Sequence, residues 1–315
     1  MQGYKQTMRP ASEFLALMGI WLACFAAGNI LAVVIWIAMT GQSIEEMAKG
    51  MLDAKNVSAM KVMQSVSSIL IFFVPAYITA RIVSNKPFER LGFKGGLKID
   101  RMVIAIFLML SVLPFVAWLG DVNKAIPVGA ELRKIFDNFE SQFENQVKQL
   151  AQFKSPLDYI SALFVIALLP ALVEEAFFRG GMQKVLHRWF VNPHVAILAT
   201  SIIFSLIHFS FYGFLPRIAL GMMLGYIFYF TGNLWYSVLG HFVNNGLMVS
   251  ILYVQYLKDK TIDTKVGESA PWWAAIISII LVVFLFLQLR RRAGTKVSFD
   301  SIADTPAERS DNTSI

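Results

Sequence analysis

Apolar residues along this chain are collected into long runs that short polar segments separate. A bilayer-spanning helix needs about 20 predominantly apolar residues. At least six of the runs approach or exceed that length, and two shorter runs are counted with them. The pattern predicts an all-α, polytopic transmembrane helical bundle of about eight spans, over residues 14–39, 60–83, 102–119, 158–178, 194–212, 215–231, 233–256 and 271–289.

The segment between the third and fourth spans has a different pattern. From Glu131 to Phe153, apolar residues recur three or four positions apart with charged residues between them. This spacing gives one apolar helical face, which is typical of a helix lying on a membrane surface. The alternatives for this helix are packing against the bundle and a short coiled coil. We expect this helix to guard or line the approach to the core from the outer face.

Two further segments are short or polar. Only Gly232 and Asn233 separate the sixth and seventh spans, so these spans are predicted to form a tight antiparallel hairpin. The tail after Lys296 is rich in polar residues and is predicted to be disordered. The sequence predicts five regions. Residues 1–119 hold three N-terminal spans, 120–157 a loop with the amphipathic helix, and 158–256 a four-span catalytic core. Residues 257–289 hold the last span, and 290–315 form a basic-to-polar tail.

Composition agrees with a membrane protein. Of the 315 residues, 56% are hydrophobic and 16% are charged, and the mean hydropathy is +0.58. Ordinary soluble domains carry about 25% charged residues, so a pair of such domains is excluded. The net charge of +7 is assigned to loops that face the lipid bilayer. No basic stripe interleaved with aromatic residues is present, so a nucleic-acid partner is not expected.

Two features of the sequence limit chemistry and targeting. Cys24 is the only cysteine, which excludes disulfides, iron–sulfur clusters and cysteine-based zinc sites within one chain. The first apolar run, from Phe14 to Met39, is much longer than the apolar region of a signal peptide, so it is interpreted as a retained span. Basic residues are dense in the loop after the second span and at Arg290–Arg292. By the positive-inside rule, this predicts a protein of the cell membrane with both termini in the cytoplasm.

Ionisable and amide side chains inside the predicted spans are the candidate chemistry. Such groups are expensive at bilayer depth and usually mark a functional site. They are concentrated in the fourth, fifth and seventh spans, at Glu174, Glu175, Arg179, His208, His241 and Asn245. A single intramembrane histidine or asparagine is often only a hydrogen-bonding contact between helices, but several of them in spaced pairs favour a function.

Helical geometry sorts these residues. Glu175 and Arg179 lie four apart and share a face, which predicts a structural ion pair. Glu174 projects about 100° away and is left free to face another group. Pro170 lacks the amide that would bond to Ile166, so a kink is expected just before the glutamates. In an antiparallel hairpin of the fourth and fifth spans, Glu174 and His208 lie at matching heights.

This set of residues suits hydrolysis in two ways. In one, Glu174 takes a proton from water, His208 orients that water or donates to the leaving group, and His241 and Asn245 donate to an oxyanion. In the other, Glu174, His208 and His241 hold a zinc ion, Zn2+, whose bound water is the nucleophile. The sequence alone does not choose between them.

Three spaced motifs then point to a family. Glu174-Glu175-x-x-x-Arg179, Phe204-x-x-x-His208 and His241-x-x-x-Asn245 resemble the motifs of the CAAX protease and bacteriocin-processing family, also called the type II CAAX prenyl endopeptidase or Abi family. The resemblance covers residues 155–255. Signatures of other membrane proteases, such as His-Glu-x-x-His, are absent.

The resemblance implies an intramembrane endopeptidase with an all-helical core. It implies Glu174 as the general base supported by Glu175 and Arg179, His208 acting with Glu174 on the water, and His241 with Asn245 as the oxyanion site. Both metal-dependent and metal-free mechanisms are described for the family. The expected partners are peptide or protein substrates, including membrane-bound and prenylated ones. The alternatives are a non-catalytic scaffold or immunity protein of the same fold, or an ion-coupled transporter that uses the buried Glu and His residues.

Overall fold

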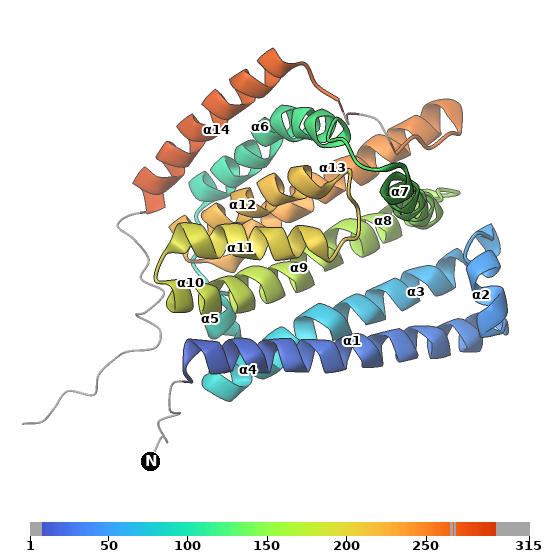
Figure 1. The fold of residues 1–315 in the computed structure, drawn as a ribbon, viewed down its shortest axis with the longest axis horizontal. Coiled ribbons are helices and arrows are strands. Elements are labelled where there is room, and N and C mark those ends of the chain that lie inside the picture. Colours follow the sequence, from blue (N-terminus) through green and yellow to red (C-terminus); the bar gives the residue numbers. More distant parts are fainter. Residues whose placement is uncertain (1–7, 265–266, 268, 294–315) are drawn as a thin grey trace, which may run out of the picture.

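The computed structural model describes residues 8–264, 267 and 269–293, which form a bundle of helices without strands in this part of the chain (Figure 1). Seven helical segments in it are long and apolar enough to cross a membrane: Pro10–Thr40, Ala54–Val83, Ile99–Lys124, Pro156–Phe190, Phe214–Thr231, Leu234–Asp259 and Trp272–Ala293. The predicted all-α polytopic fold is confirmed. The tail predicted to be disordered begins beyond Lys296 and lies outside the described residues.

The predicted fifth span differs from the structure. Helix α11 (Pro193–Leu206) has 14 residues and ends well before position 212. Beyond Leu206 the chain closes into tighter turns, in which His208 N donates to Ser205 O at 3.3 Å. Phe209 has a φ of 49°, which a right-handed helix does not allow. At about 1.5 Å per residue α11 spans about 21 Å, less than a bilayer core.

The N-terminal third forms one side of the bundle, where α1 (Pro10–Thr40) runs along α3 (Val57–Ser68) and α4 (Val74–Val83) (Figure 1). The shorter elements of this region are α2 (Ile44–Gly50), the 3-10 turn η1 (Ala54–Asn56), the π-helical turn η2 (Ile69–Phe73) and α5 (Pro87–Leu91). Gly41 ends α1 with a φ of 68°, and Ser43 caps α2 together with Glu46, so the chain reverses within a few residues.

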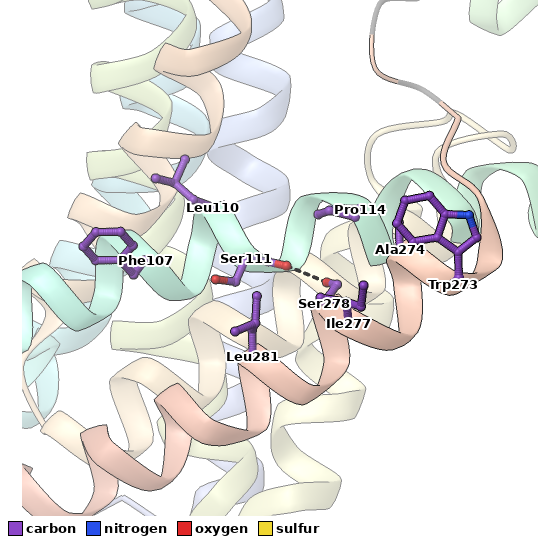
Figure 2. A pocket seen from close by; sticks show the side chains of 9 residues that line it. All are labelled: Phe107, Leu110, Ser111, Pro114, Trp273, Ala274, Ile277, Ser278 and Leu281. Atoms are coloured by element: carbon purple, nitrogen blue, oxygen red, sulfur yellow. Dashed lines mark hydrogen bonds between the residues drawn. The ribbon is translucent and has the colours of Figure 1, made fainter.

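Helix α6 (Ile99–Lys124) packs against the last helix, α14 (Trp272–Ala293). A groove of about 350 Å³ runs between them, and Ser278 Oγ donates to Ser111 O across it at 2.5 Å (Figure 2). Its other lining residues are mostly apolar, including Phe107, Leu110 and Trp273. None of the candidate site residues borders this groove. The amphipathic helix α7 (Ala130–Leu150) follows α6 and lies at the same end of the bundle as α2 (Figure 1).

The segment that carries the glutamates is one continuous helical path from Pro156 to Phe190. It consists of α8 (Pro156–Ala162), the π-helical η3 (Leu163–Leu168), α9 (Leu169–Glu175), the π-helical η4 (Ala176–Gln183) and α10 (Lys184–Phe190). Val191, with a φ of 59°, turns the chain into α11. The path therefore passes from α-helix to π-helix directly after the two glutamates.

The predicted hairpin of the sixth and seventh spans is confirmed. Helix α12 (Phe214–Thr231) and α13 (Leu234–Asp259) are joined by Gly232 and Asn233 alone. Gly232 has a φ of 61°, and the Asn233 side chain accepts a hydrogen bond from Trp235 N at 3.2 Å. This turn fixes the register of α13, and with it the height of His241.

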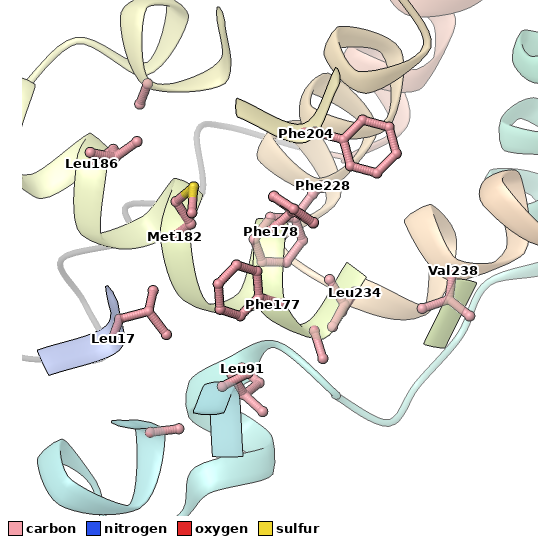
Figure 3. Packing of buried hydrophobic residues seen from close by; sticks show 14 of the residues in the cluster. Leu17, Leu91, Phe177, Phe178, Met182, Leu186, Phe204, Phe228, Leu234 and Val238 are labelled. Atoms are coloured by element: carbon pink, nitrogen blue, oxygen red, sulfur yellow. The ribbon is translucent and has the colours of Figure 1, made fainter. Parts of the chain in front are cut away.

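Packed aromatic residues hold the helices around η4 together. Phe177 and Phe178 follow the glutamates and lie at the centre of the main apolar cluster, with Leu91 and Leu234 nearby (Figure 3). The rings of Phe178 and Phe204 meet edge to face at 5.1 Å. The apolar core therefore lies directly against the turn of helix that positions the candidate site.

Candidate active site

The predicted ion pair between Glu175 and Arg179 is present. Arg179 Nη1 lies 3.0 Å from Glu175 Oε1, and the side chains are 1% and 0% exposed. Arg179 Nη2 also donates to the carbonyl of Gly221 on α12 at 3.1 Å, and its guanidinium lies 5.0 Å from the centroid of the Phe204 ring. A buried ion pair needs such additional partners to offset desolvation. The pair therefore joins the glutamate helix to α12 and α11.

Glu174 lies outside this pair, as its position on the helix predicts. Its side chain is 14% exposed, and its Oε2 lies 4.0 Å from Nε2 of His241 on α13. This separation exceeds a direct hydrogen bond, and groups at such a distance are commonly bridged by water. Glu174 and His241 are thus placed to hold one small polar molecule between them.

His241 is oriented by the other glutamate. Its Nδ1 lies 3.0 Å from Glu175 Oε1, and the ring is buried. An ionised carboxylate only accepts hydrogen bonds, so Nδ1 is the protonated nitrogen and Nε2 of the neutral ring carries a lone pair. Arg179, Glu175 and His241 form a chain of contacts that directs Nε2 toward Glu174. In this tautomer His241 accepts a hydrogen bond from water more readily than it donates to an oxyanion.

His208 lies in the turn after α11 and not inside a span. Its Nδ1 donates to Phe204 O at 2.7 Å, which leaves Nε2 as the free nitrogen. The described residues show no hydrogen bond or ion pair between His208 and Glu174. His208 is connected to the site through the Phe204 ring, whose centroid is 4.8 Å from the His208 ring and 6.2 Å from the His241 ring.

Phe204 is therefore a site residue in addition to the six residues predicted from the sequence. It begins the second spaced motif, and its ring contacts Arg179, His208 and His241. The signal was its position four residues before His208, but an aromatic residue in an apolar run is indistinguishable from ordinary core by pattern alone.

Asn245 has a structural contact that the missing amide hydrogen of Pro170 explains. Pro170 has no amide hydrogen, so the carbonyl of Ile166 loses its regular helical partner. Asn245 Nδ2 donates to that carbonyl at 3.3 Å, and Asn245 Oδ1 accepts from Asn244 Nδ2 at 3.0 Å. An amide nitrogen has two hydrogens, so the bond to Ile166 uses only one of the two donors of Asn245.

The residues do not fit the three-ligand zinc site that the sequence left open. In the part of the chain that the structure describes, no three His, Cys, Asp or Glu side chains are grouped so that they could hold a metal ion. An open catalytic zinc site needs three protein ligands. Glu174 and His241 face each other, whereas in the described residues no contact joins His208, whose Nε2 is free, to either of them.

A large cavity adjoins this group of residues. It measures about 1100 Å³, lies among α6, α7 and α13, and reaches Arg217 and Asn244. The six candidate residues do not line it, but Arg217 interacts electrostatically with Glu174 as well as with Glu140 of α7. Arg217 thus lines the cavity and is near enough to the candidate catalytic glutamate to act on its charge.

Comparisons with known proteins agree with the three motifs. Residues 156–247 match the family model for Rce1-like proteins, the type II CAAX prenyl endopeptidase Rce1-like family. This segment contains all six candidate residues, so the family resemblance is confirmed over it.

A curated relative, "Uncharacterized protein YpbD" of Bacillus subtilis (strain 168), is 25% identical over 103 residues. The aligned part is 31% of this chain and 50% of the relative, so the chain spans about half the length of the curated relative it matches. No solved structure matches the chain.

Proposed function

We propose that this chain, which carries an Rce1-like domain over residues 156–247, is an intramembrane endopeptidase that hydrolyses peptide bonds with a water activated by Glu174. One observation carries the proposal: the two adjacent glutamates contact different groups, and they face different nitrogens of the His241 ring. Glu175 is bound to Arg179 and His241, whereas Glu174 stays outside that pair and faces His241 Nε2. A carboxylate and an imidazole nitrogen directed at one point suit a general base and its water.

The reaction follows from these groups. Glu174 takes a proton from the water while the water oxygen attacks the carbonyl carbon, and His241 Nε2 accepts the other water hydrogen and orients the lone pair. The remaining N–H of Asn245 is the donor for the oxyanion, and the positive charge of Arg217 favours its formation. Glu174 then delivers its proton to the amide nitrogen as the carbon–nitrogen bond breaks, which restores the carboxylate.

The proposed setting is the cell membrane, with both termini in the cytoplasm. The proposed substrates are peptides or proteins that reach the site from the bilayer or its surface, including prenylated ones. The cavity beside Arg217 supports entry from the end of the bundle that carries α7.

The test compares purified wild type with Glu174→Gln in detergent micelles. The probes are a farnesylated peptide, its unprenylated parent and a set of transmembrane-segment peptides, with cleavage followed by mass spectrometry. Loss of a general base lowers the rate by about 10²–10⁴-fold, so we expect Glu174→Gln to fold and to cleave at least 100-fold more slowly. Glu131→Gln, at an exposed carboxylate, is the matched control and retains activity.

Two results would count against the proposal. If Glu174→Gln cleaves as fast as the wild type, Glu174 is not the base. If a folded wild type cleaves none of the probes, the scaffold interpretation gains support.

A chelator distinguishes the two hydrolytic mechanisms. Because no three-ligand set is present in the described residues, we expect cleavage to be unchanged after exhaustive treatment with a zinc chelator. Loss of activity that added zinc restores would overturn the metal-free mechanism while leaving the assignment of a protease intact.

A further inference from the structure

The turn that carries His208 is held by α7. Four consecutive residues of this turn, Phe209 to Tyr212, each contact a residue of α7 in the described structure. Ser210 Oγ donates to Glu140 at 2.7 Å and Tyr212 Oη donates to Asp137 at 2.6 Å. The Phe211 ring stacks on Phe136 at 4.2 Å with planes 4° apart, and the Phe209 ring stacks on Phe139 at 6.2 Å.

Other contacts hold a different part of the same turn. Asn123 at the end of α6 donates to Phe211 O at 2.7 Å and accepts from Leu215 N at 3.1 Å. Asn123 thus fixes the backbone at the start of α12. Ser210 lies two residues from His208, and its contact with Glu140 of α7 acts on the half of the turn that carries the histidine.

The two hydrogen bonds to α7 are charge-assisted. A hydroxyl that donates to a carboxylate forms a short, strong bond, and the bond to Asp137 raises the pKa of the Tyr212 phenol. Phe143, one turn after Glu140, lies under the guanidinium of Arg217 at 5.2 Å. One face of α7 therefore contacts both the His208 turn and the arginine that interacts with Glu174.

Helix α7 is fixed at its other end. Val147 and Leu150 are buried, and Gln149 Nε2 donates to Leu52 O beside α2 at 2.9 Å. The half from Phe136 to Phe143 contacts the His208 turn and borders the cavity of about 1100 Å³. Helix α7 precedes residue 156, so it lies outside the segment that matches the family model.

We infer that α7 is part of the active site of this protein, and that Glu140 and Asp137 are positioning residues that hold the His208 turn in its working conformation. This inference rests on the proposed function and adds His208 to it, because the ring of His208 reaches the site through Phe204. It goes beyond the expectation that the helix guards or lines the approach, because it gives α7 a contact with the turn that carries His208.

The test uses Glu140→Ala, Glu140→Gln and the control Glu131→Ala in the full-length protein. Glutamine still accepts the hydrogen bond from Ser210, whereas alanine cannot. Glu131 lies on the same helix and pairs with Lys134 in solvent. Hydrogen–deuterium exchange of residues 207–213 needs no substrate, and kcat and KM are measured with whichever of the probe peptides the wild type cleaves best.

A hydrogen bond to a charged group contributes about 1.5–3 kcal/mol, which corresponds to about 13–160-fold at 1.36 kcal/mol per factor of ten. We expect Glu140→Ala to increase exchange in the turn and to lower kcat by about tenfold or more with little change in KM. Glu140→Gln returns the exchange rate of the turn and kcat toward their wild-type values, and Glu131→Ala changes neither the exchange rate nor kcat. In the pair Glu140→Ala/Ser210→Ala, the second substitution adds little to the first.

The outcomes separate this inference from the proposed function. Unchanged exchange in Glu140→Ala, or faster exchange with full activity, overturns the role of α7 and leaves the protease assignment standing. Faster exchange in Glu140→Ala that is reversed in Glu140→Gln supports the role of α7 in holding the His208 turn, even if the wild type cleaves none of the probes. Absence of cleavage by the wild type would count only against the protease assignment.

Discussion

At the residue scale, Pro170 and Asn245 form a complementary pair. The proline deprives the Ile166 carbonyl of its helical donor, and the asparagine supplies a donor from another helix at 3.3 Å. The same asparagine was selected from the sequence as an oxyanion donor. Its two amide hydrogens allow a structural and a catalytic role at once, and substitutions can separate the two.

Replacing Asn245 by alanine removes that donor from the Ile166 carbonyl, and the loss of one such hydrogen bond costs about 0.5–1.5 kcal/mol of stability. Adding Pro170→Ala returns a backbone amide, so we expect the double variant to recover stability relative to Asn245→Ala alone. Unfolding titrations of the wild type, Asn245→Ala, Pro170→Ala and the double variant in mixed micelles measure this coupling. If Asn245 also binds the oxyanion, the double variant stays slow in peptide cleavage. Strictly additive losses of stability would show that the two residues are independent.

The buried ion pair permits a second prediction at this scale. Arg179→Leu leaves the fully buried Glu175 carboxylate without its cation and lets His241 lose its fixed orientation. Breaking a buried pair costs about 3–5 kcal/mol. We expect a loss of that size in the same unfolding titration, whereas Lys134→Leu, at an exposed lysine of α7, changes stability by less than about 0.5 kcal/mol. Equal stability of the two variants would contradict the role given to Arg179.

At the scale of the element, the helix that carries the glutamates is shaped by what packs against it. Its π-helical stretch η4 begins directly after Glu175 and contains Arg179, Gly180 and Gly181. Gly180 approaches the backbone of Leu91 at the end of α5, and a Cβ built on it would lie 2.7 Å from Leu91 O. A Cβ on Gly181 would meet only side-chain and backbone atoms at 3.6 Å or more.

These two glycines give a matched pair of substitutions. Gly180→Ala forces α5 away from η4, because the obstacle is backbone and cannot rotate aside. We expect it to lower stability by about 1–3 kcal/mol, as overpacking does, and to reduce cleavage through displacement of Arg179. Gly181→Ala has ordinary contacts and a helical backbone, so we expect it to be neutral or stabilising. Thermal unfolding of both variants measures the difference, and a neutral Gly180→Ala would refute the close approach.

At the scale of the whole molecule, charge is distributed unevenly between the two ends of the bundle. The end with α5 and α10 (Figure 1) holds basic side chains around one buried carboxylate, because Arg90 and Arg188 both pair with Glu13. Arg292, near the end of α14, pairs with Asp100 at 3.2 Å at the start of α6. These basic residues are clustered at one end, and by the positive-inside rule they predict that this end faces the cytoplasm.

Single cysteines test that orientation. Cys24 is the only native cysteine, so Cys24→Ser gives a background without thiols. We expect Asn85→Cys, exposed at the basic end, to react with a membrane-impermeant maleimide only after cells are opened. Glu131→Cys on α7 reacts in intact cells. The reverse labelling pattern would invert the topology and place α7 and the cavity on the cytoplasmic side.

Much of the site followed from the sequence because its signals are local. Charged side chains in apolar runs are conspicuous, and a spacing of four residues identifies which share a helical face. The ion pair of Glu175 with Arg179, the position of Glu174 outside that pair and the hairpin at Gly232 follow from the sequence in this way. Each depends on backbone geometry within one helix or one turn.

What only the tertiary structure decided depends on contacts between distant segments. The sequence could not show that α11 stops at Leu206, because apolar residues continue beyond it and the termination comes from the turn at Phe209. It could not show that Glu175 binds His241, that Phe204 joins the two histidines, or that α7 holds the His208 turn. Periodicity defines the apolar face of a helix, but the partner of that face is set by packing of the whole chain.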